Sequence, residues 1–369
     1  MLLVQASRDA LLKPLTTVMG IVERRHTLPI LANILLRKEG NRVSFIATDL
    51  EVQITTHAEI GVGDEMGSTT VAVRKLVDIL RALPSGNEVA LTLQDDKLIV
   101  QSGRSRFALQ TMDAGDFPVL AQPAQWDLSF AMPQNALKHI LNSVHFAMAQ
   151  QDIRYYLNAM LFVFEPGLVR TVATDGHRLA HHATEAHGID ERQDVIVPRK
   201  TVLEMQRLFS DADAPVQIEV AAGQMRFNFD GVELITKLVE GKFPDYTRVI
   251  PTSYTRHIII NREALQASLK RAAILTTDKL RGVRVQLAEN KLKISASNAE
   301  QEEAKEELEV DYAYESLDVG FNVSYLLDVL ANTKNQDMRL SVQPDSNASV
   351  LVTLPEEDAF KYVVMPMRI

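Results

Sequence analysis

The sequence predicts an α+β protein of three similar domains, each made of two strand–helix–three-strand units. The first observation is a β-like run that ends in a turn residue and occurs three times, with the turn residues about 125 residues apart. That spacing is too long for a solenoid repeat and fits duplication of a whole domain. The runs occupy residues 45–51, 170–180 and 294–300, and their turn residues are Asp49, Asp175 and Asn298.

The second observation is that the segments around each run also repeat. An apolar segment precedes each run and joins it through a turn, and an amphipathic helical segment follows it. The apolar segments are residues 33–36, 158–161 and 283–287, and the helical segments begin near Arg74, Arg199 and Val323.

In the first domain, residues 2–5 resemble a strand, and Ser7 is a suitable N-cap for the helix that follows. Three short strands are expected at 33–38, 43–48 and 51–60. A second helix and three more strands then complete the domain. The two helices have apolar residues at helical spacing, namely Leu11, Leu12, Leu15, Val18, Met19 and Val22, and then Leu76, Ile79, Leu80 and Leu83.

The second and third domains repeat this order. Pro133 is expected at the first position of a helix, and Asn261 is expected to cap the first helix of the third domain. Proline-containing connections at 122–123 and 250–253 mark the boundaries. The predicted domains are therefore residues 1–122, 123–251 and 252–369.

The predicted antiparallel sheets would have their helices on one face. Three similar domains in a row can form an arc, and two copies related by a two-fold axis are the usual way to close one. Twelve helices spaced about 8–10 Å apart would enclose a circle on the order of 35 Å across, which is wide enough for a nucleic-acid duplex.

Composition limits the functional classes. The chain has 369 residues, no cysteine, a formal net charge of −9 and 46% hydrophobic residues, so each domain can bury its own core. It has neither a long apolar run nor a signal peptide, and we expect a soluble cytoplasmic protein. The negative charge argues against a general nucleic-acid coat but allows a local basic surface.

Basic residues recur on or beside the predicted helices of all three domains, while acidic residues gather elsewhere, as at 302–307. A single charged helix face is usually only solvated. Basic residues that repeat on helices lining the same wall favour contacts with nucleic-acid phosphates, and such contacts do not depend on the base sequence. The basic positions include Lys13, Arg24, Lys75, Lys138, His139, Arg207, Arg262, Lys270 and Arg271.

Candidate catalytic chemistry is sparse. Asp175 and His177 have the residue types of an acid–base pair, but the matching positions of the other repeats lack the histidine, so we predict no catalytic residue. His177, His181 and His182 suggest a metal by spacing, yet exposed histidines at a strand end are the favoured interpretation. We therefore predict no metal and no cofactor.

Several motifs together resemble the bacterial DNA polymerase III beta subunit, the sliding-clamp family, over essentially the full length. The motifs are residues 27–31, 47–51, 102–107, 151–157, 171–179, 197–200, 243–246, 320–325 and 362–368. Each motif alone is weak, whereas the set is specific. The resemblance implies the DNA clamp fold, with helices on the inner face of a ring.

The resemblance also implies a function. The family's ring homodimer surrounds duplex DNA, is loaded by an ATP-driven clamp loader, and tethers DNA polymerase and repair proteins without catalysis of its own. Carried onto this chain, sequence-independent DNA contacts fall on Arg25, Arg74, Gln151, Tyr155, Tyr156, Arg199 and Lys200. The dimer interface pairs Phe107 and Leu109 with Ile274 and Leu275.

The resemblance further implies a groove for short linear peptides of partner proteins. Leu280 stands where the family often has phenylalanine, so the groove wall is expected to differ there, and Asn347 is another departure from the family. The groove residues are Leu157, Thr174, Gly176, His177, Arg178, Leu179, Pro244, Arg248, Val249, Asn322, Tyr325, Val363, Met365, Pro366 and Met367, with Arg178 and Arg248 at the rim.

Two alternatives remain open. One is an enzyme that acts on nucleic acid through a site near Asp175 and His177. This reading needs chemistry at a single site, which the threefold repeat disfavours. The other is a monomeric scaffold that binds no nucleic acid, and the mass of the protein in solution distinguishes it.

Overall fold

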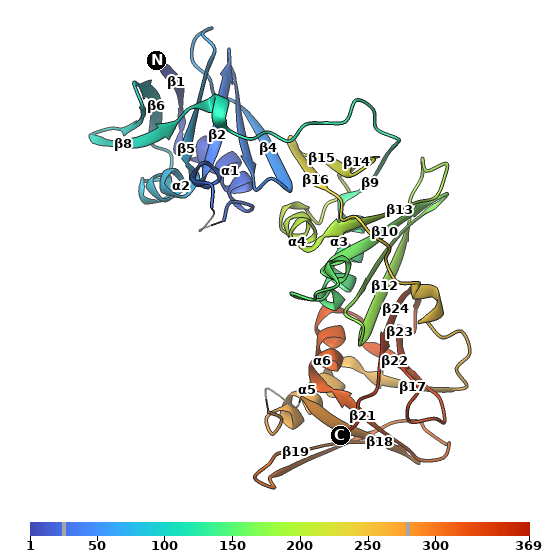
Figure 1. Ribbon diagram of the computed structural model, residues 1–369. Coiled ribbons are helices and arrows are strands. Elements are labelled where there is room, and N and C mark those ends of the chain that lie inside the picture. Colours follow the sequence, from blue (N-terminus) through green and yellow to red (C-terminus); the bar gives the residue numbers. More distant parts are fainter. Residues whose placement is uncertain (24–26, 278–280) are drawn as a thin grey trace. The chain divides into compact units, whose positions relative to one another are not determined.

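The computed structural model describes residues 1–23, 27–277 and 281–369 (Figure 1). Over these residues the chain forms six consecutive units, each of one strand, one α-helix and three strands. Period-2 and period-3.6 hydrophobic patterns therefore predicted both the types and the order of the elements correctly.

The first two units contain β1 (Leu2–Ser7), α1 (Arg8–Met19), β2 (Asn33–Glu39), β3 (Arg42–Thr48) and β4 (Val52–Glu59), then β5 (Gly67–Ala72), α2 (Val73–Ala82), β6 (Glu88–Gln94), β7 (Lys97–Ser102) and β8 (Ser105–Met112). The next two contain β9 (Leu128–Pro133), α3 (Gln134–Val144), β10 (Ala159–Glu165), β11 (Leu168–Thr174) and β12 (Arg178–Glu185), then β13 (Gln193–Pro198), α4 (Arg199–Leu208), β14 (Pro215–Ala221), β15 (Gln224–Phe229) and β16 (Val232–Lys237). The last two contain β17 (Arg256–Asn261), α5 (Arg262–Ala273), β18 (Gly282–Ala288), β19 (Lys291–Ser297) and β20 (Glu303–Glu309), then β21 (Leu317–Asn322), α6 (Val323–Asn332), β22 (Asp337–Val342), β23 (Val350–Leu354) and β24 (Glu357–Val364).

The helix caps agree closely with the predictions. The Ser7 hydroxyl accepts the backbone N–H of Ala10 at 3.3 Å, and the Asn261 side chain accepts that of Ala264 at 3.0 Å. Pro133 is the exception, because it ends β9 and α3 begins one residue later. Pro133 faces Pro215 in the β9–β14 ladder.

The strands of the described residues form three antiparallel sheets of twelve, eight and four strands. Two ladders join strands from different predicted domains: β4 pairs with β16, and β12 pairs with β24. The chain divides into two compact units, residues 1–135 with 203–238 and residues 136–202 with 239–369. The boundaries of the three domains predicted from the sequence stay a prediction.

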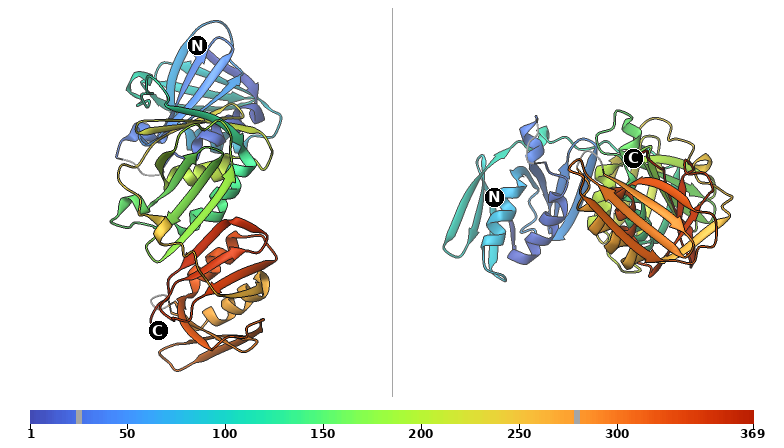
Figure 2. Two further views of the ribbon diagram at one scale, coloured as in Figure 1. Left: turned by 90° about the vertical axis from the view of Figure 1, so that its right-hand side faces the viewer. Right: turned by 90° about the horizontal axis from the view of Figure 1, so that it is seen from below.

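Within each unit the helices cover sheet faces. Helices α1 and α2 lie side by side in the first unit, and α5 and α6 do so in the second (Figures 1 and 2). Each helix buries its apolar stripe, as α1 does with Leu11, Leu15 and Val18. None of the described helices is long and apolar enough to cross a membrane.

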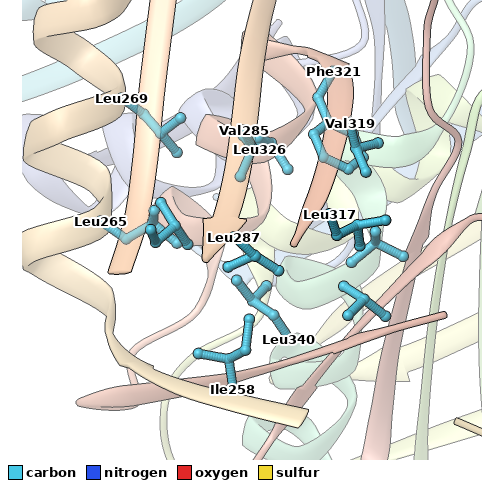
Figure 3. Close-up of a pocket in the computed structure, with 13 residues that line it drawn as sticks. Ile258, Leu265, Leu269, Val285, Leu287, Leu317, Val319, Phe321, Leu326 and Leu340 are labelled. Carbon is cyan, nitrogen blue, oxygen red and sulfur yellow. The ribbon is translucent and has the colours of Figure 1, made fainter. Parts of the chain in front are cut away.

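The C-terminal part of the second unit has its core between α5, α6 and strands of two sheets. Figure 3 shows this core, where apolar side chains converge from β17, α5 and β18 and from β21, α6 and β22. They enclose a cavity of about 50 Å³. Since its lining is almost wholly apolar, water gains no hydrogen bonds there and the cavity should be dry.

Leu269→Ala tests how much this core contributes to stability. Leu269 is fully buried and lines the cavity, so truncation adds to an existing void. We expect a loss of about 2–5 kcal/mol in the free energy of unfolding, measured by urea denaturation. Ile259→Ala, at a position that is 47% exposed on β17, is the control and should change stability by at most about 0.5 kcal/mol. Equal losses in the two variants would contradict this assignment.

Candidate functional site

The repeated turn residue has the same structural role in all three copies. In each, one side-chain oxygen accepts two backbone N–H groups just beyond it and closes the turn between two strands. Asp49 Oδ1 accepts from Glu51 and Val52 (3.0 and 2.7 Å), Asp175 Oδ1 from His177 and Arg178 (2.9 and 3.0 Å), and Asn298 Oδ1 from Glu300 and Glu302 (3.1 and 3.0 Å).

Only the second copy adds a buried arginine. Nε of Arg178 donates to Asp175 Oδ2 at 3.1 Å, Nη1 donates to Asp328, and Nη2 donates to the Phe146 carbonyl at 2.8 Å. Its guanidinium lies 4.5 Å from the ring centroid of Tyr325, within cation–π range. This one side chain connects β12, α6 and the segment after α3.

The surroundings keep Arg178 charged. Burial alone would lower its pKa, but the neighbouring Tyr362 oxygen and the carboxylates of Asp328 and Asp175 raise the pKa above the usual value. Its side chain is only 10% exposed. The expectation that Arg178 lies at the rim of a groove is therefore wrong, and the physical reason is the ion-pair network that pulls its guanidinium inward.

This network also bears on the acid–base alternative. Both oxygens of Asp175 are engaged, by two backbone N–H groups and by Arg178. Asp175 contacts His177 through the backbone N–H, while the His177 ring stacks near Tyr325 at 6.4 Å between centroids. A general base needs a free lone pair that points at its proton donor, and this geometry does not supply one.

A pocket of about 170 Å³ opens beside the turn, within the second unit. Its apolar walls continue into a buried cluster that includes Leu161, Phe243 and Val363. The pocket is lined by Arg154, Leu157, Thr174, Gly176, His177, Arg178, Leu179, Pro244, Tyr246, Val249, Val363 and Met365.

The strand pairing brings these distant residues together. In the β12–β24 ladder Leu179 faces Val363, and the Met365 N–H donates to the His177 carbonyl at 2.9 Å just beyond it. The chain end is thereby held against the turn. Gly176 has φ +90°, and a Cβ there would meet the Arg154 guanidinium at 3.2 Å, so glycine keeps this wall open.

Ten of the fifteen residues predicted for the groove line this pocket. Two further lining residues, Arg154 and Tyr246, were missed, although both fall inside motifs that were recognised. Arg154 forms two hydrogen bonds with the Asp152 carboxylate, at 3.0 and 2.9 Å, and these lower the Asp152 pKa to about 2. Tyr246 is buried and its hydroxyl accepts from Arg170.

The other five predicted groove residues do not line the pocket. Arg248 extends into solvent, 86% exposed, and pairs with Asp245. Asn322 caps α6 by accepting the Ser324 N–H at 2.9 Å. Tyr325 packs on Arg178. The Met367 N–H donates to the Gly320 carbonyl at 2.8 Å, and this hydrogen bond directs Pro366 and Met367 away from the pocket.

The residues predicted to contact DNA fall in separate places. Gln151, Tyr155 and Tyr156 lie in one segment of the second unit, and Tyr155 is 58% exposed. Arg199 and Lys200 begin α4, and the Arg199 N–H donates to the Asn158 carbonyl at the end of that segment. Arg74 lies on α2 in the first unit, and Arg25 lies outside the described residues, as does Leu280.

Two of the arginines have unusual surroundings. Burial lowers the pKa of Arg199, and the nearby Arg178 lowers it further. Arg74 donates to the Val22 carbonyl, and its Nε is buried without a hydrogen-bond partner among the described residues. Nη1 of Arg199 is likewise buried without a hydrogen-bond partner among the described residues, so both guanidiniums are incompletely paired.

The residues predicted for the dimer interface are apolar and partly or largely solvent-accessible. Ile274, just after α5, is 76% exposed and Phe107 on β8 is 38% exposed, whereas Leu109 and Leu275 are half-buried. Exposed large apolar side chains of this kind often mark a contact surface.

The histidine prediction needs a correction. His181 and His182 were expected to be exposed, but they are 7% and 1% exposed. Successive residues of a strand point to opposite faces, so His181 and His182 do not converge on one site. Both faces of β12 are covered at this point: His181 packs near Tyr246, and His182 packs near Phe360.

Six β-α-β-β-β units and an apolar pocket at the β12–β24 junction define a protein of the DNA-clamp class. Residues 2–121, 131–245 and 247–368 match the N-terminal, central and C-terminal domains of the DNA polymerase III beta subunit. The chain belongs to the DNA polymerase III beta subunit family.

Individual relatives agree along the whole chain. The beta sliding clamp of Pseudomonas aeruginosa is 45% identical over 363 residues, which is 98% of each chain. The crystal structure of the DNA polymerase III subunit beta from that organism superposes with a TM-score of 0.96 at 44% identity, covering both chains fully. A Caulobacter crescentus clamp, with PEG bound in a region assigned to tethering of the beta motif, has a TM-score of 0.93 at 37% identity over both full chains.

Acidification tests the burial of His181. Burial, followed by the positive charges of Arg170 and Lys361, lowers its pKa to about 4. The unfolded chain, with a pKa near 6.5, binds more protons between those values, so folding stability falls as pH falls through that window. Between pH 7 and pH 5 we expect a loss of about 2 kcal/mol from this residue, measured by urea denaturation.

His181→Phe, which preserves an apolar ring beside Tyr246, should lack this part of the loss. His187→Phe changes an exposed histidine of the same domain and should keep the wild-type pH dependence. An unchanged pH profile in His181→Phe would show that His181 protonates as readily in the folded protein as in the unfolded chain.

Proposed function

We propose that the chain is a processivity factor: two copies close a ring around duplex DNA, slide along it without reading sequence, and hold polymerases and repair proteins through the pocket at the β12–β24 junction. It performs no catalysis. The observation that carries the proposal is the set of six repeated units together with full-length similarity to sliding clamps. An enzyme with a single active site does not require such a repeat.

Two sheet edges support the dimer. Among the described residues, β20 pairs on one side only, with β19, and β8 pairs with β5 only near its end, at Thr111 and Met112. Unpaired edges are templates for another strand. The exposed Arg104 and Arg106 are at β8, whereas β20 is acidic, so the charges of the two edges are complementary.

The apolar residues beside these edges complete the proposed interface. Phe107 and Leu109 lie on β8, and Ile274 and Leu275 follow α5, whose Arg271 pairs with Glu306 of β20. A contact between the first domain of one copy and the third of the other is heterologous, and it forms a closed ring when the rotation fits.

Phosphate contacts are proposed for Arg25, Arg74, Gln151, Tyr155, Tyr156, Arg199 and Lys200. Retention on DNA would rest on topology, so direct affinity should be weak and decrease with salt. The incompletely paired guanidiniums of Arg74 and Arg199 support their place in this set.

The pocket is proposed to bind an extended peptide with one or two leucine or phenylalanine anchors. Its walls are apolar, and His177, Arg154 and the edge of the turn supply polar groups. Met365 is 43% exposed, and methionine adapts to several partners. Arg248, Asn322, Tyr325, Pro366 and Met367 would border the longer part of a bound segment.

Retention on circular DNA tests the ring. Wild-type protein, once loaded, should stay on a closed circular duplex and leave after the duplex is linearised. Ile274→Ala with Leu275→Ala truncates one exposed and one half-buried side chain, so the chain should fold but be monomeric by light scattering and unretained on either DNA. Ile153→Ala, at a position 96% exposed, is the control and should remain a dimer. Equal retention of wild type on circular and linear DNA would exclude sliding by encirclement.

Peptide binding tests the pocket separately. A short peptide with two leucine anchors should bind wild type with a Kd on the order of micromolar, since few residues are buried. Met365→Ala should weaken binding at least about tenfold, because it removes an anchor-sized side chain from the wall, and deletion of residues 365–369 should abolish it. Calorimetry gives the affinities, and light scattering should show that both variants remain dimers.

Met66→Ala provides the matched control for this experiment. Met66 is 73% exposed and lies in the first unit, so its truncation removes a methionine side chain without touching the pocket. Its peptide affinity should equal that of wild type. Normal binding by the truncated chain would place the peptide site elsewhere.

A further inference from the structure

Three side chains with metal-binding atoms meet on the side of β12 opposite His181. His139 comes from α3, His182 from β12 and Glu357 from the start of β24, and their ligand atoms all lie within 4.8 Å of one another. Glu357 Oε1 is 2.6 Å from His182 Nε2 and 3.9 Å from His139 Nε2. The sequence prediction of no metal site did not consider this set, because its members are far apart along the chain.

The hydrogen bonds of Ser143 determine which ring nitrogen of His182 carries a proton. Ser143 Oγ lies 2.6 Å from the His139 carbonyl and also 2.6 Å from His182 Nδ1. A carbonyl can only accept, so the single hydroxyl proton goes to it. The hydroxyl oxygen must then accept from His182, which places a proton on Nδ1.

The other ring nitrogen then faces a carboxylate with a lone pair. Nε2 of a neutral imidazole with its proton on Nδ1 is an acceptor, as is Glu357 Oε1 at 2.6 Å. Two acceptors in contact need a cation: a second ring proton fits the 2.6 Å separation as it stands, whereas a metal ion binds both atoms once they separate to about 3.4 Å. His182 is 1% exposed, and His139 Nε2 lies 3.9 Å from the same carboxylate oxygen, so a third donor atom stands beside the pair, as a metal ion needs and a proton does not.

We propose that His139, His182 and Glu357 bind one divalent transition-metal ion, Zn²⁺ being the best fit, with water at the fourth position. Two imidazoles and a carboxylate are a donor set that Zn²⁺ accepts, at about 2.0–2.2 Å from each ligand atom. Tetrahedral ligands at those lengths are about 3.4 Å apart, so each donor needs to move by less than about 1 Å. The Ser143 hydroxyl holds the tautomer that leaves Nε2 free to bind the metal.

The position of this cluster indicates what the metal would do. His139 and His182 belong to the second predicted domain, and Glu357 belongs to the third, at the opposite end of β24 from the pocket. His139 is 60% exposed, which gives the ion a route from solvent. A bound ion would fasten α3 and β12 to β24 and thereby stabilise the ladder that forms the pocket wall.

Calorimetric titration of the chelator-treated, full-length protein with ZnCl₂ tests the site. We expect one Zn²⁺ per chain, and tetrahedral absorption bands when Co²⁺ is used instead. His139→Ala and Glu357→Gln should each weaken Zn²⁺ binding at least about tenfold, and Ser143→Ala should weaken it about 10–100-fold through loss of the tautomer. His139→Ala removes an accessible side chain and Glu357→Gln is isosteric, so both should fold.

His187→Ala is the matched control, because His187 is an exposed histidine of the same domain outside the cluster. It should keep full Zn²⁺ affinity. Absence of Zn²⁺ binding would overturn the proposal in favour of an imidazolium–carboxylate pair. The proposal would also be overturned if Zn²⁺ binding were unchanged in His139→Ala and Glu357→Gln, or if His187→Ala weakened it equally. The ion would then bind to surface histidines outside the cluster.

Discussion

The antiparallel pairing of β12 with β24 is the constraint on which the candidate site depends. These strands lie about 180 residues apart in sequence, and their ladder runs from Arg178 opposite Val364 to His181 opposite Lys361. Register in such a ladder decides which face every side chain takes. A slip of one residue in β12 would turn Leu179 away from the pocket and put Arg178 or Ala180 in its place.

Arg178 holds the end of that ladder in place. Its guanidinium reaches the turn carboxylate of Asp175, Asp328 on α6 and the Phe146 carbonyl, so three elements share one charge. A buried arginine is tolerated only when such partners offset its desolvation. Asp328 is 41% exposed, and this partial hydration makes the arrangement less costly than a fully buried ion pair. The pocket is therefore built on a polar framework with apolar walls.

Local patterns in the sequence were enough to predict the units, since hydrophobic period and N-caps such as Ser7 and Asn261 depend on near neighbours. The joining of β4 to β16 was not predictable, because it depends on two sheet edges that meet only in the folded chain. The buried histidines were missed for a related reason. A strand that is covered on both faces does not alternate between polar and apolar residues, so the sequence pattern gave no indication that His181 and His182 are buried.

A difference at one position, glycine in place of a larger residue, explains why the second copy of the repeated turn has a pocket beside it. At the matching position of the first copy, Leu50 has φ +78°, a conformation that costs energy for a residue with a Cβ. Its side chain packs against a cluster that includes Ile30, Leu31 and Phe117, so the first copy fills this space with its own residues. Gly176 has no side chain to do so, and the corresponding apolar surface stays open between Leu179 and Pro244. The same turn thus occurs three times, and the copy with glycine at this position leaves the apolar surface open as a pocket.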